Sequence, residues 1–320
     1  STQNTAGLRQ PFPNNRIPKD RLDPVSSKML DLYPAPNRDA VQNFLFNAPQ
    51  TDDVEQVDTR FDHRFRDRDT IFLRYSFHDR AKLESGTLPL PASGSDTLLR
   101  DVRAHTAVLS ETHIFPGANL VNEVRVAYSR NVALGDTPTK ERLWQQLGFK
   151  GLVDREDING LPLFTVSGFS ALGDRATTPD PKTADVRQIV DNLSWTKGRH
   201  SVRFGGNIRS FVRYAGTADS ARGRFTFNGQ FTGAQAGRGS GSSVADALLG
   251  LTSTAQIMTP RNVSQISWAY EFYVQDNWKV TPKLTLNLGL RYEYQAPYWE
   301  RNDRAANFLF DPGLPGAGTL

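Results

Sequence analysis

Residues 267–294 read SWAYEFYVQDNWKVTPKLTLNLGLRYEY, and their side chains alternate between apolar and polar along two successive segments. In the first segment, the apolar side chains occupy every second position, which we call the apolar parity, and they are Trp268, Tyr270, Phe272, Val274 and Trp278. In the second segment, it consists of Leu284, Leu286, Leu288, Leu290, Tyr292 and Tyr294. A period of two residues predicts β-strands with one apolar face and one polar face.

The connection Val280-Thr281-Pro282-Lys283 is too short for a parallel crossover, so the two strands are expected to form one antiparallel hairpin. Aromatic residues stand at the ends of its apolar face, and the proposed lipid-facing girdle consists of Trp268, Trp278, Tyr292 and Tyr294. From the first Trp to the second, the strand spans about 33 Å, or about 25 Å of height at a tilt near 40°. That height suits a membrane barrel, although a soluble β-sandwich also alternates.

The composition favours an all-β protein. Only 38% of the 320 residues are hydrophobic and the mean hydropathy is -0.50, with no apolar run near the roughly 20 residues of a membrane helix. A membrane barrel stays compatible with these values because half of each strand faces a polar interior. The chain has 25 Gly, 19 Pro, 19 Phe, 9 Tyr and 5 Trp, which suits many strands joined by irregular loops.

Charge and reactive residues point away from nucleic-acid binding and catalysis. The net charge of +4 comes from 38 Lys and Arg against 34 Asp and Glu, mixed along the chain rather than gathered in a basic tract. The chain has no Cys, and its 5 His show neither metal-ligand spacing nor a nucleophile beside a base. We therefore expect no enzyme activity, no catalytic or metal residues and no cofactor.

Two regions are predicted. Residues 1–50 are rich in proline and read as an extracellular loop with one short helix over Asp23–Leu32, capped by Asp23 and opened by Pro24. Residues 51–320 read as part of a barrel. Hairpins are expected near residues 56–77, 102–128, 189–214 and 268–294, and a second short helix over Lys140–Leu147.

Loop lengths decide between the barrel and the sandwich. Connections inside each hairpin are a few residues long, whereas those between hairpins are long, at about 79–100, 131–184, 215–265 and 295–320. Short periplasmic turns and long outer loops are typical of outer-membrane barrels, whereas a sandwich distributes its loop lengths between both ends. The fold class expected is all-β: an antiparallel transmembrane β-barrel segment of about eight strands as four hairpins, with the barrel incomplete.

The polar parity carries a set of cationic side chains that we assign to a candidate lumen-facing substrate path: Arg74, His105, Arg125, Arg203, Arg209 and Arg291. Carboxylates interleave with them, so a solvated wall with cross-strand ion pairs, which needs no substrate, is the favoured interpretation of the same residues. Asp191 and Asp276 instead share the apolar parity. They lie near the short turns, where a charge facing lipid costs least, or a β-bulge re-aims them.

Several stretches resemble one family of membrane proteins. They are PFPNNRIPKDRLDPVSSKMLDLYPAPN from Pro11, VDTRFDHRFRDRDTIFLRYSF from Val57, WTKGRHSVRFGGNIR from Trp195, GRFTFNGQFTG from Gly223 and FYVQDNWKVTPKLTLNLGLRYEY from Phe272. Together they resemble the TonB-dependent outer-membrane receptors, in particular the Oar-like receptors abundant in acidobacterial genomes.

The resemblance implies a barrel of about 22 strands with a plugged lumen, of which this chain would supply about eight. The chain opens on Ser1 without a signal peptide and shows no plug, TonB box or closing strand, so we expect an internal barrel fragment. The implied location is the outer membrane of a Gram-negative bacterium. The implied partners are outer-membrane lipid, the TonB energy-coupling complex through a plug outside this chain, and an unknown small-molecule or glycan ligand, with no nucleic acid.

The function expected is active uptake of a nutrient, such as a siderophore or a glycan, with the long outer loops capturing the ligand. A surface adhesion or structural barrel without transport is the alternative, because long outer loops serve either role. A soluble carbohydrate-binding sandwich is a third possibility, which partitioning of the protein into outer membranes would exclude.

Overall fold

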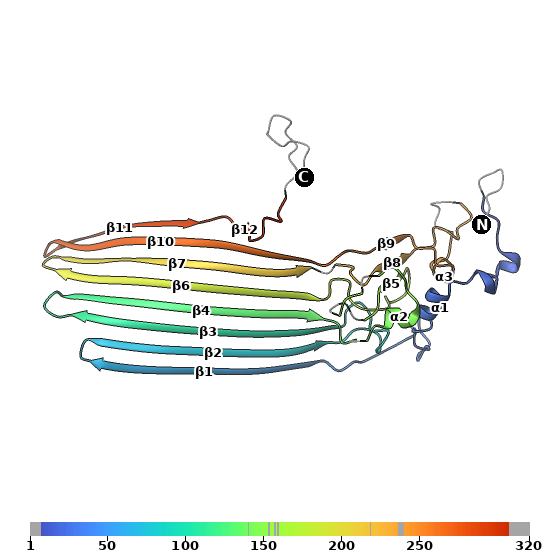
Figure 1. Ribbon diagram of the computed structural model, residues 1–320, viewed down its shortest axis with the longest axis horizontal. Helices are drawn as coiled ribbons and strands as arrows, with labels where there is room; N and C mark the ends of the chain where they lie inside the picture. The colour runs from blue at the N-terminus through green and yellow to red at the C-terminus, as the bar shows by residue number, and fades with distance from the viewer. Residues whose placement is uncertain are drawn as a thin grey trace, which may run out of the picture.

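The computed structural model describes residues 8–139, 141–152, 154–156, 158, 160–217, 219–235 and 240–306. They form a long open sheet with a layer of folded loops at one end (Figure 1). The long strands are β1 (Thr51–Arg66), β2 (Asp69–Glu84), β3 (Leu98–Phe115), β4 (Leu120–Asp136), β6 (Asp180–Lys197), β7 (His200–Thr217), β10 (Arg261–Thr281) and β11 (Leu284–Gln295). The shorter elements are η1 (Pro13–Asn15), η2 (Lys19–Arg21), α1 (Pro24–Leu30), α2 (Leu143–Leu147), β5 (Leu163–Val166), β8 (Arg224–Phe227), α3 (Ser243–Leu248), β9 (Thr254–Gln256) and β12 (Trp299–Glu300).

The long strands lie side by side in the order β1-β2-β3-β4-β6-β7-β10-β11, each antiparallel to its neighbours. The short strand β12 pairs with β10 beyond the end of β11. Within the described residues β1 and β11 are the two edges and do not pair with each other, so the sheet does not close. The predicted all-β fold of eight strands in four hairpins, without barrel closure, is confirmed.

The four hairpin turns lie at one end of the sheet. They span residues 67–68, 116–119, 198–199 and 282–283. The connections at the other end span residues 85–97, 137–179 and 218–260. The alternation of short and long connections predicted from the sequence is therefore confirmed.

The loop boundaries themselves are corrected, because the strands extend further than the polarity pattern indicates. The pairs Glu84↔Leu98, Gly135↔Asp180 and Arg261↔Thr217 still belong to the regular ladder. At these positions the side chains no longer alternate between apolar and polar, but backbone hydrogen bonding needs no such alternation. Each of these three loops is shorter than predicted by several residues on either side, and most of the fourth predicted loop, 295–320, lies outside the described residues.

One face of the sheet is apolar across its whole width. Directly paired residues form one row, with one member from each long strand: Phe61, Leu73, Leu109, Val126, Ile189, Ile208, Tyr270 and Tyr294. None of these side chains is buried, and Phe61 is 63% exposed. A continuous exposed apolar surface of this extent needs a cover that the described residues do not supply.

The compact hydrophobic core lies in the loop layer and not in the sheet. Its buried members are Met29, Leu88, Ala92, Leu161, Phe164, Val166, Leu172, Phe227 and Ala247. They come from the first 50 residues and from all three long connections. The parallel pair β5–β8, extended by β9, forms a second small sheet within the layer, where the rings of Phe164 and Phe227 lie 4.5 Å apart. The sequence predicts only loops with two short helices in this region.

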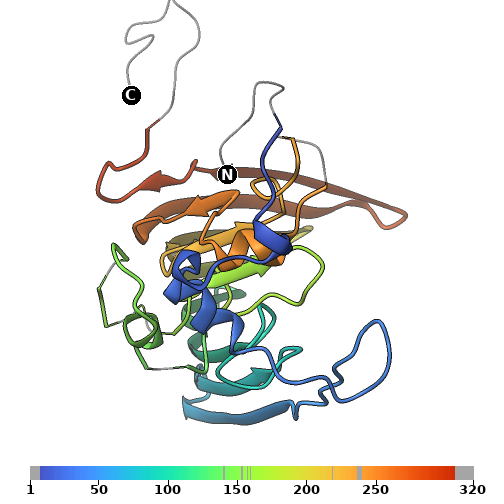
Figure 2. The same cartoon turned by 90° about the vertical axis from the view of Figure 1, so that its right-hand side faces the viewer.

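Helix α1 confirms the short helix predicted near the N-terminus. Asp23 is its N-cap and accepts a hydrogen bond from the Ser26 backbone N–H at 2.7 Å, with Pro24 at the first helical position. The Asp23 N–H donates to the Leu248 carbonyl at 2.8 Å, which holds α1 beside α3 (Figure 2). The second helix begins at Leu143, and Lys140, its predicted start, lies outside the described residues. No helix in the described part of the chain has the length and apolarity to cross a membrane.

Candidate functional site: the polar face of the sheet

The face opposite the apolar row is polar over most of its width. The neighbouring row of paired residues reads Asp62, Phe72, Ser110, Arg125, Val190, Asn207, Glu271 and Glu293. The two rows differ by a single residue along each strand, since successive side chains point to opposite faces. Strand alternation thus places a charged surface directly behind an apolar one.

Glu271 on β10 is the centre of the densest charge network on this face. Its carboxylate forms ion pairs with the Arg209 guanidinium on β7 and with the Arg291 guanidinium on β11, the latter at 2.8 Å. The Asn207 amide also donates to it at 3.1 Å and accepts a hydrogen bond from Gln188 at 2.9 Å. Only 15% of the Glu271 side chain is exposed, so three neighbouring strands are joined through one nearly covered carboxylate.

A close contact beside this network depends on a glycine. The Tyr273 hydroxyl on β10 donates to the Asn192 side chain on β6 at 2.8 Å, so its ring passes over Gly205 on the intervening strand β7. A Cβ at Gly205 would lie 2.9 Å from the Tyr273 ring and 2.5 Å from the Asp191 carbonyl oxygen. An aromatic ring covering a strand glycine fixes the register of three strands.

Cations surround an aromatic ring on the other half of the polar face. The Arg60 guanidinium lies 4.3 Å from the centre of the Phe72 ring, and the Arg125 guanidinium lies 5.9 Å from it. Arg60 also pairs with Asp62 at 2.7 Å, and Arg125 with Glu123. Because both guanidiniums are already paired with carboxylates, this region is a balanced polar wall rather than a free cationic surface.

Comparison with known proteins identifies the kind of protein to which these faces belong. The family model described as "Outer membrane beta barrel domain" matches residues 1–319. The chain belongs to this outer-membrane β-barrel family. Among solved structures the chain is similar to the outer membrane transporter YddB from Escherichia coli, with a TM-score of 0.48 and 11% sequence identity. The match covers 79% of this chain and 29% of that chain, so the chain spans less than a third of YddB. No curated protein matches it.

Membership in the family places the protein in the outer membrane and orients the barrel segment. In such barrels the apolar face meets lipid, the polar face lines the interior, and the short turns are periplasmic. The folded loop layer is therefore on the extracellular side. The face with the row from Phe61 to Tyr294 is assigned to lipid, and the face with Glu271 to the lumen.

The structure places five of the six residues of the predicted substrate path on the lumen face. Arg209 and Arg291 meet at Glu271, whereas Arg74 pairs with Asp58 at 3.5 Å and Arg125 with Glu123 on other strands. Arg203 lies opposite Ser194 and Gln275 and has no ion pair within the part of the chain that the structure describes. The five arginines do not converge on one site, which favours the wall of cross-strand ion pairs.

The sixth residue, His105, was assigned to the wrong face. It pairs with Phe77 in the β2–β3 ladder, and its Nδ1 lies 2.8 Å from the Tyr75 hydroxyl, so it shares the face of the apolar row. Its neighbours on β3 alternate between small residues of similar polarity, such as Ala104, Thr106 and Ala107, which gives the parity little contrast. The register with β2 resolves the face that the sequence of β3 leaves open.

The four proposed girdle residues lie on the lipid face. Tyr292 pairs with Phe272 and Tyr294 with Tyr270, while Trp268 and Trp278 occupy the same parity of β10. Further aromatic side chains join them at two levels, near the turns at Phe65, Phe115 and Trp195, and toward the loops at Tyr75 and Tyr128. Their role as membrane girdles stays a prediction.

Asp191 and Asp276, the two aspartates that the sequence places on the apolar parity, have partners on the lipid face. The Asp191 carboxylate accepts a hydrogen bond from the Asn122 amide at 2.5 Å, and Asp276 lies 2.6 Å from His200 Nδ1. The ladders run through both positions without a shift in register. A β-bulge therefore does not re-aim either residue, and each is instead accommodated by a polar neighbour on the adjacent strand.

The extracellular loops contain a buried carboxyl, Asp174, and a buried guanidinium, Arg222. Asp174, 1% exposed, accepts hydrogen bonds from the Thr137 hydroxyl at 2.5 Å and the Leu161 N–H at 2.6 Å. Burial raises the pKa of Asp174, and the positive charge of Arg222 partly opposes this shift. Arg222 is also buried, and its burial lowers the pKa of its guanidinium. Gly160, at φ +99°, lies so close that a Cβ there would be 2.0 Å from the Asp174 carboxylate. The sequence carried no signal for these two buried groups, since they are widely separated.

One group of potential metal ligands also escaped the sequence analysis. Side-chain atoms of Asp69, Glu111 and His113 lie within 4.8 Å of one another at the turn end of β2 and β3. Asp69 already bonds to His113 Nδ1 at 2.5 Å, and Glu111 is exposed. The group is accounted for as a cross-strand hydrogen-bonded pair beside a solvated carboxylate.

Glu271→Gln should weaken the lumen network. The amide cannot balance two guanidiniums, so we expect the free energy of unfolding to fall by about 1 to 2 kcal/mol, less than for fully buried pairs because Arg291 is 55% exposed. Urea unfolding of the full-length barrel in detergent would measure the change. Glu293→Gln, on an exposed residue that pairs with Arg291 alone among the described residues, is the matched control. Equal losses in the two variants would contradict the central position of Glu271.

Proposed function

We propose that this chain is part of an outer-membrane receptor of the TonB-dependent class that takes up a scarce nutrient, such as a siderophore or a glycan. The observation that carries the proposal is the folded extracellular layer. A buried core and the buried hydrogen bonds of Asp174 hold it together, and it stands at the loop end of a charged lumen wall. A built binding surface above a polar path suits capture of a solute followed by its passage.

The sequence strings that resemble Oar-like receptors support the same proposal. The parts that would couple the barrel to energy, a plug and its contact with the TonB complex, would lie outside this chain. The remaining proposed partners are outer-membrane lipid at the apolar face and a small-molecule or glycan ligand at the loops, without nucleic acid. We propose no catalytic step for this chain.

Uptake by cells that express the full-length gene tests this proposal. Radiolabelled siderophores and oligosaccharides would be supplied one at a time to expressing cells and to cells with the gene deleted. We expect at least one solute to accumulate only in expressing cells, and a protonophore to abolish the accumulation, because TonB-dependent transport draws on the proton gradient. Accumulation that persists with the protonophore would show passive permeation instead.

A surface adhesion barrel is the second candidate function, and the same folded extracellular layer would serve it. Adhesion would be favoured if expressing cells attach to matrix-coated surfaces and take up none of the siderophores or oligosaccharides. Attachment that is unchanged by deletion of the gene, together with energy-dependent uptake, would exclude it.

A further inference from the structure

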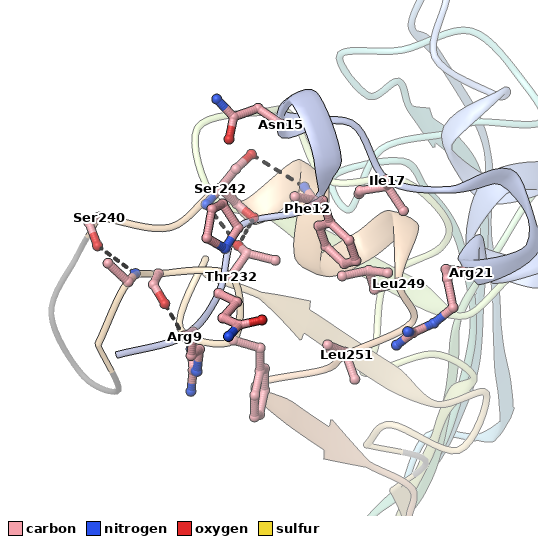
Figure 3. A pocket seen from close by; sticks show the side chains of 16 residues that line it. Arg9, Phe12, Asn15, Ile17, Arg21, Thr232, Ser240, Ser242, Leu249 and Leu251 are labelled. Atoms are coloured by element: carbon pink, nitrogen blue, oxygen red, sulfur yellow. Dashed lines mark hydrogen bonds between the residues drawn. The ribbon is translucent and has the colours of Figure 1, made fainter. Parts of the chain in front are cut away.

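A pocket of about 710 Å³ opens in the extracellular layer between the N-terminal stretch and the segment around α3 (Figure 3). Its walls come from residues within 9–21 on one side and within 231–234 and 240–251 on the other. The volume lies in the range of about 300 to 1,000 Å³ that small-molecule sites occupy. None of the lumen arginines discussed above lines it.

Hydrogen bonds between residues more than 200 positions apart in the sequence form the pocket before a ligand binds. The Arg9 N–H donates to the Ala234 carbonyl at 2.9 Å, and the Arg9 guanidinium donates to the Gln230 carbonyl at 2.6 Å. On the far wall, the Ser242 N–H donates to the Thr232 hydroxyl at 3.0 Å. A pocket tied together in this way needs little ordering when a ligand binds.

The lining combines cationic and apolar side chains without a carboxylate. None of the sixteen described residues that line it is Asp or Glu, and two are Arg. Arg9 is engaged by backbone carbonyls, whereas the Arg21 guanidinium has no hydrogen bond or ion pair to any described residue. In Figure 3, Arg21 lies on the same side of the pocket as Phe12, Leu249 and Leu251, whereas Arg9 lies on the opposite side.

We propose that this pocket binds a small amphipathic anion, with its carboxylate, sulfonate or phosphate group at Arg21 and its apolar body against Phe12, Leu249 and Leu251. A guanidinium recognises such oxyanions through charge-assisted hydrogen bonds, and the apolar wall buries the remainder of the molecule. The inference deepens the proposed function by naming a ligand class for the extracellular layer.

Binding of 2-naphthoate and of its neutral counterpart 2-naphthamide to the full-length protein in lipid nanodiscs tests the proposal. We expect saturation-transfer NMR titrations to give at least tenfold tighter binding of the naphthoate. Arg21→Gln should remove that preference, and Leu251→Glu, at an exposed position, should abolish naphthoate binding. Arg16→Gln is the matched control, because Arg16 is exposed on the same segment but does not line the pocket.

Equal affinity for the two probes, absence of binding, or naphthoate binding that survives both pocket substitutions would overturn the proposal. The outcome is independent of transport. Anion binding without energy-dependent uptake would leave the pocket standing and remove the uptake function. Energy-dependent uptake of a solute by a protein that shows no preference for the anion would remove the pocket proposal and leave the uptake function standing.

Discussion

Val126→Arg is expected to destabilise the folded barrel by about 2 to 4 kcal/mol, the cost of an arginine facing lipid near the middle of the membrane. Val126 is 46% exposed on the lipid face of β4, and its direct partners Leu109 and Ile189 offer no carboxylate. Urea titration of the full-length protein in lipid vesicles, followed by heat-modifiable gel mobility, would measure the loss of folded barrel.

The matched control is Ala127→Arg, one residue further along the same strand. Ala127 points to the lumen face between Val108 and Gln188, where an arginine remains solvated. We expect a change below about 1 kcal/mol for this variant. Similar losses at the two positions would refute the assignment of the faces.

The lipid face also contains positions where the same substitution should be milder. Leu288 on β11 pairs directly with Asp276, whose Oδ1 has no hydrogen-bond partner among the described residues. An arginine at position 288 can therefore pair with a carboxylate that already lies on that face. Leu288→Arg should cost less than Val126→Arg in the same titration, although the sequence pattern ranks the two positions alike.

Asp174→Ala is expected to destabilise the extracellular layer by about 3 kcal/mol, because it leaves the Leu161 N–H and the Thr137 hydroxyl buried without acceptors. Hydrogen exchange measured by mass spectrometry on the full-length protein would show faster exchange in residues 85–97 and 160–179. The strands below the layer should keep their protection. Asp154→Ala is the control, since Asp154 is 53% exposed and pairs with Arg142 at the surface. The control should change protection by less than about 1 kcal/mol.

The pH dependence of the same layer follows from the raised pKa of Asp174. In the folded layer this carboxyl binds its proton up to a higher pH than in the unfolded chain, whose value is 3.8. The folded state thus holds more protons between the two values, and its stability falls as pH rises through that window. Asp174→Asn removes this contribution, and an unchanged pH profile in that variant would contradict it.

The sequence was informative wherever one strand carried a strong contrast between its two faces. Along β10 and β11 the alternation of large apolar and polar residues predicts the hairpin and both of its faces. Along β3 the side chains that flank His105 are small and similar in polarity, and the pairing with Tyr75 and Phe77 decided its face instead. Alternation along a strand shows toward which face a side chain points only when the residues on the two faces of that strand differ clearly in polarity.

The loop layer could not be predicted for a different reason. Its core joins Phe164 to Phe227 and Met29 to Ala247, and the buried Arg222 guanidinium donates to the Thr178 hydroxyl. Such contacts depend on the sheet bringing the ends of distant strands together, and short Gly-rich segments carry no periodicity that reveals them. The Arg9 bonds that build the pocket are likewise set by tertiary structure alone.

The central claim, that one face of this sheet meets lipid and the other lines the barrel, can be measured along a single strand. The chain contains no Cys, so single cysteines can be introduced from residue 122 to residue 130 and spin-labelled in the full-length protein in lipid vesicles. Labels at Val124, Val126 and Tyr128 should be accessible to oxygen, which concentrates in lipid. Labels at Arg125, Ala127 and Ser129 should be accessible to a water-soluble nickel chelate. A profile without this two-residue alternation, or with the opposite phase, would contradict the account.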